Sequence, residues 1–150
     1  MTEDEKRIRQ LMIATNMVDG SYAGLAKQMG VKENTLVLLY ALMDGEEHSQ
    51  IEISREWLMP KTTLNTILNE CVEQGLVLRI SRQHTKEKGI RLTEPGKEYA
   101  ARILRRVHEA ELLAWKNTLA QYPPSFVEAF AAFAKHLSRE MQKQFAEKTG

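Results

Sequence analysis

In the middle of the chain the hydrophobic pattern changes its period twice, and this change limits the possible folds more than any other feature. Apolar residues first recur at helical spacing in two short segments, 50–57 and 61–74, which only "LMP" separates. The pattern then alternates residue by residue, with Leu76, Leu78 and Ile80 on one expected face, and a second alternating stretch follows at 90–92. We therefore predict a helix-turn-helix followed by two short antiparallel strands.

The remaining segments show helical spacing only. One apolar stripe runs through 4–29 despite two glycines, and the segment 33–43 is apolar nearly all round, so it should be a buried helix that ends at Gly45. After Thr93 the chain returns to a long helix, which "YPP" separates from a last one. The expected fold class is mainly α with a small two- or three-stranded antiparallel wing, in one domain that spans 1–150.

The second helix of the predicted helix-turn-helix has an unusual polar face. Its buried side is expected to carry Leu64, Ile67, Leu68 and Cys71, while the other side carries Thr and Asn where a merely solvated helix usually carries Glu and Lys. The base edges of the DNA major groove present mixed donors and acceptors, which short polar side chains of this kind can match. We expect Lys61 near a phosphate and Thr62, Asn65 and Thr66 to contact bases. The candidate recognition residues are Lys61, Thr62, Thr63, Asn65, Thr66 and Asn69.

The loop between the two predicted strands, together with its strand ends, concentrates positive charge. The net charge of the 150 residues is only +1, yet residues 79–91 hold five Lys or Arg and one acidic residue, Glu87. Basic side chains in such a hairpin bind phosphates, which adds affinity more than sequence choice. The candidate residues for contacts to the DNA backbone or minor groove are Arg79, Arg82, His84, Lys86 and Lys88.

Other kinds of site find little support in the sequence. The one cysteine, Cys71, is expected to be a small buried hydrophobic residue. The four histidines lie far apart without ligand spacing, and no glycine-rich phosphate loop or catalytic triad is recognisable, so we expect no metal, no cofactor and no enzymatic activity. No apolar run reaches 18 residues, and the N-terminus "MTEDEKRIRQ" is charged where a signal peptide is apolar, so we expect a soluble, cytoplasmic protein.

The order of these elements resembles the MarR family of winged helix-turn-helix transcriptional regulators. The resemblance extends over nearly the whole chain and is carried by "QIEISREWLMPKTTLNTILNECVEQGLVLRI" and "KEKGIRLTEPGKEYA", with "QGLV" and "IRLTEPG" the most specific fragments. It implies a DNA-binding part at 31–93 and dimerisation helices at 1–30 and 94–150. In two features this chain departs from the usual pattern. His84 and Lys86 replace the acidic residue and the arginine usual at the wing tip, and Leu58 occupies a turn position that many helix-turn-helices give to glycine.

Large apolar residues on the first and last helices predict a homodimer. One helix-turn-helix contacts only a few base pairs, whereas a twofold pair contacts two half-sites about 34 Å apart. The alternative is that the last helix folds back on its own subunit. The candidate dimerisation residues are Ile8, Leu11, Phe126, Phe130, Phe133, Leu137 and Met141.

These observations predict a sequence-specific regulator that binds double-stranded DNA as a homodimer on a pseudo-palindromic operator. The resemblance implies a bacterial, repressor-type protein that a small aromatic or phenolic effector releases from DNA. Tyr40, Trp57 and His108 are candidate walls of an effector pocket, with ordinary core packing as the other explanation. The alternative function is a winged-helix protein-interaction module without specific DNA binding. The operator, the effector, repression as against activation, and any redox role of Cys71 are left open by the sequence.

Overall fold

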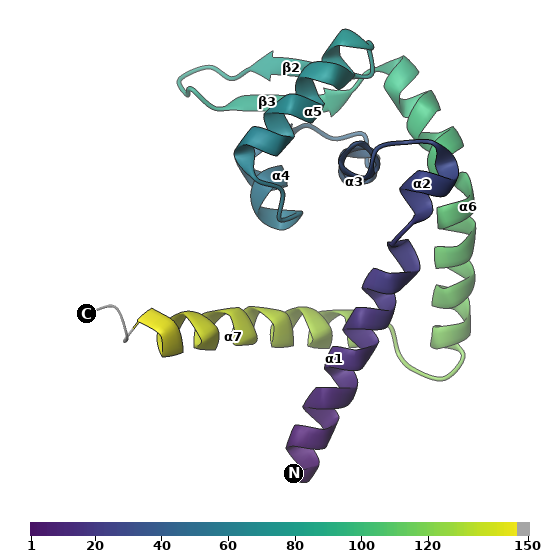
Figure 1. The fold of residues 1–150 in the computed structure, drawn as a ribbon, viewed down its shortest axis with the longest axis vertical. Helices are drawn as coiled ribbons and strands as arrows, with labels where there is room; N and C mark the ends of the chain where they lie inside the picture. Colours follow the sequence, from purple (N-terminus) through teal and green to yellow (C-terminus); the bar gives the residue numbers. More distant parts are fainter. Residues whose placement is uncertain (147–150) are drawn as a thin grey trace. The chain divides into compact units, whose positions relative to one another are not determined.

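The computed structural model describes residues 1–146 and divides the chain into two compact units, Met1–Arg105 and Arg106–Gly150 (Figure 1). The first unit contains α1 (Glu3–Tyr22), α2 (Leu25–Met29), α3 (Glu33–Leu42), β1 (His48–Ser49), α4 (Gln50–Glu56), α5 (Lys61–Glu73), β2 (Val77–Ser81) and β3 (Lys88–Leu92). The helix α6 (Glu94–Leu119) begins in the first unit and ends in the second, which also contains α7 (Phe126–Ala146). The predicted mainly helical fold with a small antiparallel sheet is confirmed.

The helix α3 is the buried centre of the first unit, as its all-round apolar sequence predicts. Leu38, Leu39 and Leu42 are completely buried, and α3 packs against α2, α5 and β3. Gly45 follows the helix with φ +79°, and its N–H bonds the carbonyl of Leu42, so the expected left-handed glycine ends this segment.

The two helices of the predicted helix-turn-helix, α4 and α5, begin and end within one residue of the expected bounds. Ser49 caps α4 by accepting a hydrogen bond from the N–H of Glu52, whose carboxylate accepts from the N–H of Ser49. Pro60 stands at the N-cap of α5, where its missing N–H costs no helical hydrogen bond. Leu64, Ile67, Leu68 and Cys71 form the buried side of α5, so the predicted core face is correct.

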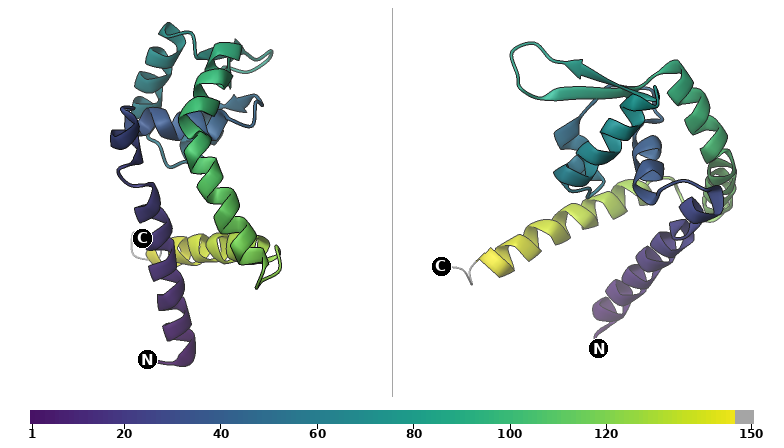
Figure 2. Two further views of the ribbon diagram at one scale, coloured as in Figure 1. Left: turned by 90° about the vertical axis from the view of Figure 1, so that its right-hand side faces the viewer. Right: turned by 45° about the horizontal axis from the view of Figure 1, so that its top comes forward.

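The sheet has three strands in the order β1-β3-β2, all antiparallel, with Arg79 paired to Ile90 and Ser49 paired to Gly89. At the start of the first wing strand, Val77 is the buried residue and Leu78 the exposed one, at 1% and 44% exposure. Leu76, directly before the strand, is half-buried and packs against the core. The loop between β2 and β3 projects away from the helices of its unit (Figure 2).

The fragments "QGLV" and "IRLTEPG" contact each other where the strands meet α6. The hydroxyl of Thr93 donates to the carbonyl of Gly75 at 2.6 Å and accepts from the N–H of Gly96 at 2.9 Å, while the N–H of Thr93 bonds the carbonyl of Leu76 at 3.0 Å. A Cβ at position 96 would lie 1.9 Å from the Leu76 carbonyl oxygen. The start of α6 is therefore held directly against the start of the sheet, and glycine is required for that approach.

The single helix expected over 4–29 is wrong, because the chain forms two helices there. α1 begins at a capping box between Thr2 and Glu5 and ends at Tyr22, and Gly24 then takes a φ of +80° before α2. Gly20 remains inside α1, so only the second glycine breaks the helix.

The second unit, Arg106 to Ala146 in its described part, consists of the end of α6 and of α7. The rings of Trp115 and Phe126 lie 5.7 Å apart across the connection between these helices. No residue of α7 is buried, although several of its side chains are large and apolar. Within the described residues, no helix is both long and apolar enough to span a membrane.

Candidate nucleic-acid interface

The polar side of α5 is exposed along its length. Lys61, Thr62, Asn65, Thr66 and Asn69 are all exposed, whereas Thr63, the sixth candidate recognition residue, is half-buried. The Thr66 hydroxyl donates to the Thr62 carbonyl at 3.0 Å, which leaves its oxygen as an acceptor for a partner outside the helix. The helical spacing thus separates the core side from the predicted DNA side as expected, with Thr63 at the boundary.

The N-terminus of α5 is suited to an anion. No side chain caps it, and its first turn contains no acidic residue, so the early N–H groups and the helix dipole are not met by protein carboxylates. Lys61 is its first residue and adds a positive charge at the same end. This arrangement favours a phosphate at the start of the helix.

A hollow of about 710 Å³ lies between α4, α5 and the wing. It brings together the polar face of α5 and the basic hairpin, which the sequence predicts separately. Thr62 and Thr66 do not line it, and neither do Arg82 and His84. Its lining residues are Gln50, Ile51, Lys61, Leu64, Asn65, Asn69, Arg79, Lys86, Glu87 and Lys88.

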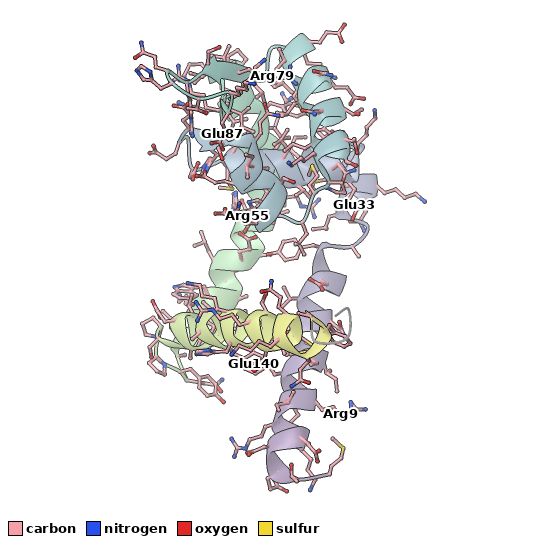
Figure 3. All side chains as sticks on the ribbon, turned by 90° about the vertical axis from the view of Figure 1, so that its left-hand side faces the viewer. Arg9, Glu33, Arg55, Arg79, Glu87 and Glu140 are labelled. Atoms are coloured by element: carbon pink, nitrogen blue, oxygen red, sulfur yellow. The ribbon has the colours of Figure 1, made fainter. Side chains whose placement is uncertain are left out.

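Two hydrogen bonds connect α5 to its neighbours inside this hollow. Arg79 on β2 donates from Nη2 to Oδ1 of Asn69 at 2.7 Å, and Gln50 on α4 donates from Nε2 to Oδ1 of Asn65 at 3.1 Å. Figure 3 shows Arg79 and Glu87 toward the sheet side of the first unit. Asn69 therefore holds a wing arginine, and Asn65 is oriented by a residue of the preceding helix.

The rest of the wing shows two kinds of basic residue. Arg82 lies 3.3 Å from Glu47, the residue before β1, with Nε facing Oε1, so its charge already has a protein partner. His84, Lys86 and Lys88 are exposed, and His84 has a positive φ of +67° in the loop. Arg82 thus holds the start of the wing loop against Glu47, while Lys86 and Lys88 are the better placed cations for a phosphate.

Sequence reasoning missed Gln50, Ile51 and Glu47 as parts of this region. Gln50 and Ile51, the first two residues of α4, line the hollow. Glu47 lies over Gly89, where a Cβ would collide with its carboxylate. The predicted helix over 50–57 already has Gln50 as its first residue. No sequence signal reports which side chains of α4 meet α5.

The cysteine and the histidines give no indication of another site. Burial, with the charge of Glu70 as a smaller cause, raises the pKa of the Cys71 thiol and so disfavours the reactive thiolate. Partial burial alone would raise the pKa of Asp44, but hydrogen bonds from His48 and from the Glu46 N–H lower it overall. Among residues 1–146, no group of three or more His, Cys, Asp or Glu side chains could hold a metal ion.

The candidate effector residues fall in both units. In the first unit, the rings of Tyr40 and Trp57 meet edge to face with centroids 5.5 Å apart. The ring centroids of Tyr22 and Tyr40 are 6.4 Å apart. In the second unit, His108 is half-buried with Nδ1 3.0 Å from Oε2 of Glu111. Tyr40 and Trp57 thus contact each other, and their role as pocket walls stays a prediction.

The candidate dimerisation residues leave large apolar surfaces uncovered in the single chain. Ile8, Phe126, Phe130 and Met141 are exposed, Phe130 to 45%, and the others, Leu11, Phe133 and Leu137, are half-buried. Neither α1 in the first unit nor α7 in the second has a buried residue, so each helix holds apolar side chains that its own unit does not bury.

Comparison with known proteins shows what the chain is similar to in sequence and in fold. Residues 29–86 match the sequence model of the MarR family. No curated protein matches the chain in sequence. Among solved structures, the fold is similar to NMB1585, a MarR family regulator from Neisseria meningitidis, with a TM-score of 0.71, 23% identity, and 95% of this chain and 98% of that chain covered.

Two further solved structures share the fold and contain a bound partner. NadR in complex with 4-hydroxyphenylacetate has a TM-score of 0.60 and 17% identity, with 84% of this chain and 90% of that chain covered. Overoxidized AbfR bound to DNA has a TM-score of 0.56 and 19% identity, with 93% of this chain and 98% of that chain covered. At these identities the likeness concerns the fold. The matched segment and the fold are thus similar to those of proteins described as MarR family regulators.

Proposed function

We propose that the chain is a winged-helix regulator of the MarR family, which its fold and the match over 29–86 support. In this proposal it is a cytoplasmic transcriptional regulator that binds double-stranded DNA sequence-specifically. The observation that carries the proposal is the hollow in which the polar face of α5 and the basic side chains of the wing lie together. A helix with that face fits the major groove, and the wing adjoins it on the same side.

In this proposal the two parts of the interface have different tasks. Phosphates lie at the N-terminus of α5 beside Lys61 and along the wing at Lys86 and Lys88, which together fix the position of the protein on the duplex. Thr62, Asn65 and Thr66 on α5 contact base edges. Arg79, held by Asn69, is a further cation in the hollow. Arg82 contributes to wing position through Glu47 more than to DNA contact.

We further propose that the protein acts as a homodimer on a pseudo-palindromic operator. The support is the apolar surface of α1 and of α7, neither of which has a buried residue within its own unit. A second copy that covers this surface would place two α5 helices against two half-sites about one DNA turn apart. A dimer that occupies both half-sites contacts about twice as many base pairs as one subunit, which gives a regulator the sequence specificity that it needs.

Release by a small aromatic or phenolic molecule completes the proposal. Support comes from the ring contact between Tyr40 and Trp57 and from the bound 4-hydroxyphenylacetate of NadR. An effector releases DNA only if it binds the DNA-free state more tightly than the DNA-bound state. A phenolic compound that leaves DNA affinity unchanged at saturating concentration would argue against this part alone.

The experiment is selection from random duplex DNA across a series of salt concentrations, with the native chain, Asn65→Ala and Lys86→Ala. We expect an enriched palindrome for the native chain. Asn65→Ala should relax the preference at one position by about 1–3 kcal/mol. Lys86→Ala should weaken all sequences equally and reduce the log–log salt slope by about 0.9 for each subunit's phosphate contact.

The alternative, a module that binds another protein, predicts a different result. A folded protein that enriches no sequence and shows no steep salt dependence even at low salt would reject the DNA proposal in favour of that alternative. Glu73→Ala serves as the matched control on α5, because Glu73 is exposed at the far end of the helix and does not line the hollow.

A further inference from the structure

We propose that Gln50 and Asn65 act as one unit that reads a single adenine in the major groove, so that Gln50, on the helix before the recognition helix, determines specificity. The inference rests on the proposed function and goes beyond it by naming a base and a residue outside α5. Its starting point is the hydrogen bond of 3.1 Å from Gln50 Nε2 to Asn65 Oδ1, which joins α4 to α5 inside the hollow.

The backbone beneath Gln50 is fixed. Gln50 is the first residue of α4, directly after Ser49, which is 1% exposed, caps the helix and pairs with Gly89 in the sheet. On the other side, Asn65 follows Leu64, which is completely embedded in the core of the first unit. The two amides therefore meet from two rigid supports, and their mutual hydrogen bond restricts the side chains further.

The hydrogen bond decides what the pair presents to DNA. A primary amide has an oxygen that accepts and a nitrogen that donates two hydrogen bonds. With the Gln50 nitrogen facing the Asn65 oxygen, the atoms that point away from the contact are the Gln50 oxygen and the Asn65 nitrogen. Exchanging nitrogen and oxygen in both amides keeps the contact and again leaves one oxygen and one nitrogen outward. The pair thus offers one acceptor beside one donor in either orientation.

Adenine is the base whose major-groove edge complements that combination. It presents the N6 amino donor next to the N7 acceptor, whereas guanine presents two acceptors, cytosine one donor, and thymine one acceptor with a methyl group. Opposite guanine, the outward oxygen of the pair would face an acceptor of the base. Opposite cytosine the outward nitrogen would have no acceptor, and opposite thymine the outward oxygen would have no donor. A polar group that is left unpaired or faces a like group in the interface lowers the binding affinity. Adenine is therefore preferred both because it pairs with the two amides and because the other bases leave one of them unpaired or repelled.

The experiment compares base preferences, position by position, in selections with the native chain, Gln50→Ala, Gln50→Glu and the control Gln28→Ala, an exposed glutamine on α2. We expect the native chain and the control to prefer adenine at one position of each half-site. Gln50→Ala should weaken that preference about tenfold at this position only, within the discrimination that one bidentate contact gives. Thermal unfolding of each variant checks that the fold is kept.

Gln50→Glu gives the sharper result. A carboxylate only accepts, so Asn65 must turn its nitrogen toward it and its oxygen outward, which leaves acceptors alone facing the groove. The preference should then move toward bases that donate, with cytosine tolerated beside adenine and guanine rejected more strongly. In a double-mutant cycle with Asn65→Ala, the double variant should discriminate no worse than Asn65→Ala alone.

The outcomes separate this inference from the function on which it rests. A native chain that enriches no sequence would remove both. A native chain that enriches an operator, with Gln50→Ala showing the same preference at every position, would overturn the role of Gln50 and leave the DNA-binding proposal standing.

Discussion

Leu58, in the turn between α4 and α5, has a backbone conformation that leucine disfavours. Its φ is +48° and its side chain is 89% exposed, so no packing compensates for the left-handed geometry. The turn is instead held by its neighbours, since the Ser54 hydroxyl donates to the Met59 carbonyl at 2.6 Å and the Met59 N–H bonds the Ser54 carbonyl at 3.0 Å. The sequence comparison with glycine-containing turns located this residue correctly, although only the structure reveals what stabilises it.

Cys71 allows a prediction about pH. Since burial raises the pKa of its thiol, we expect native protein to react with a thiol reagent only as fast as it opens, whereas unfolded protein reacts at once. Because the pKa of this thiol is higher in the folded protein than in the unfolded chain, its contribution to the free energy of unfolding is complete below the ordinary thiol pKa of about 8.5. That contribution is lost as the pH rises through the raised pKa of the folded state. Urea unfolding between pH 7 and pH 10 should therefore show a steeper loss of stability for the native chain than for Cys71→Ala.

Rapid labelling of the folded protein at pH 7 would contradict this account of Cys71 and would reopen a redox role. The lone cysteine at helical spacing with Leu64, Ile67 and Leu68 was enough to predict its burial. The pKa shift itself could not be predicted, because it depends on the packing around the thiol.

Helices and strands whose sequences show a strong hydrophobic period could be predicted. Those that form only because another part of the chain pairs with them could not. The bounds of α4 and α5 followed from Pro60, Gly75 and the apolar spacing. The strand β1 contains only His48 and Ser49, and it exists because β3 pairs with it. Two residues are too short for any period to be visible in the sequence. The break between α1 and α2 was missed because either glycine could have remained inside a helix.

The contact between the start of the sheet and the start of α6 predicts opposite effects for two Gly→Ala substitutions. Gly96→Ala should lower the free energy of unfolding by about 1–3 kcal/mol, because its Cβ meets the Leu76 carbonyl oxygen. Gly20→Ala should raise it by about 0.5–1 kcal/mol, because nothing lies within 4 Å of the new Cβ and alanine favours the helix. Urea unfolding monitored by circular dichroism measures both. Equal effects of the same sign would refute the close-approach explanation.

At the level of the assembly, we expect the exposed apolar residues of α1 and α7 to contact a partner surface. The sequence predicted which residues these are from helical spacing alone. It could not decide between a second copy and folding back within the chain, because both would cover the same stripe. We expect the second copy, because a twofold pair of recognition helices contacts two half-sites.

We therefore expect light scattering to give twice the chain mass for the native protein. Phe130→Glu should increase the dissociation constant of the dimer by about tenfold or more, since a charge would replace an apolar side chain in the interface. The control is Lys135→Glu, an exposed charged position on the same helix. A native protein that is monomeric at micromolar concentration would reject the dimer, and with it the two-half-site operator.

The sequence predicted the polar residues of α5 but not the residues that hydrogen-bond to them. Helical spacing identified Asn65 and Asn69, but the donors that fix them, Gln50 and Arg79, come from elements 15 and 10 residues away in the chain. Such contacts depend on how α4 and β2 cross α5, which no local pattern encodes.

The same two hydrogen bonds determine how this recognition surface could be transplanted. Grafting α5 alone onto another winged-helix scaffold would carry over Asn65 and Asn69 without the partners that orient them. Their amides would then adopt several rotamers, and we expect the chimera to discriminate less between bases than the native protein. The smallest portable segment runs from Gln50 to Arg79, so a designer who wishes to move this specificity must move both helices and the first wing strand together.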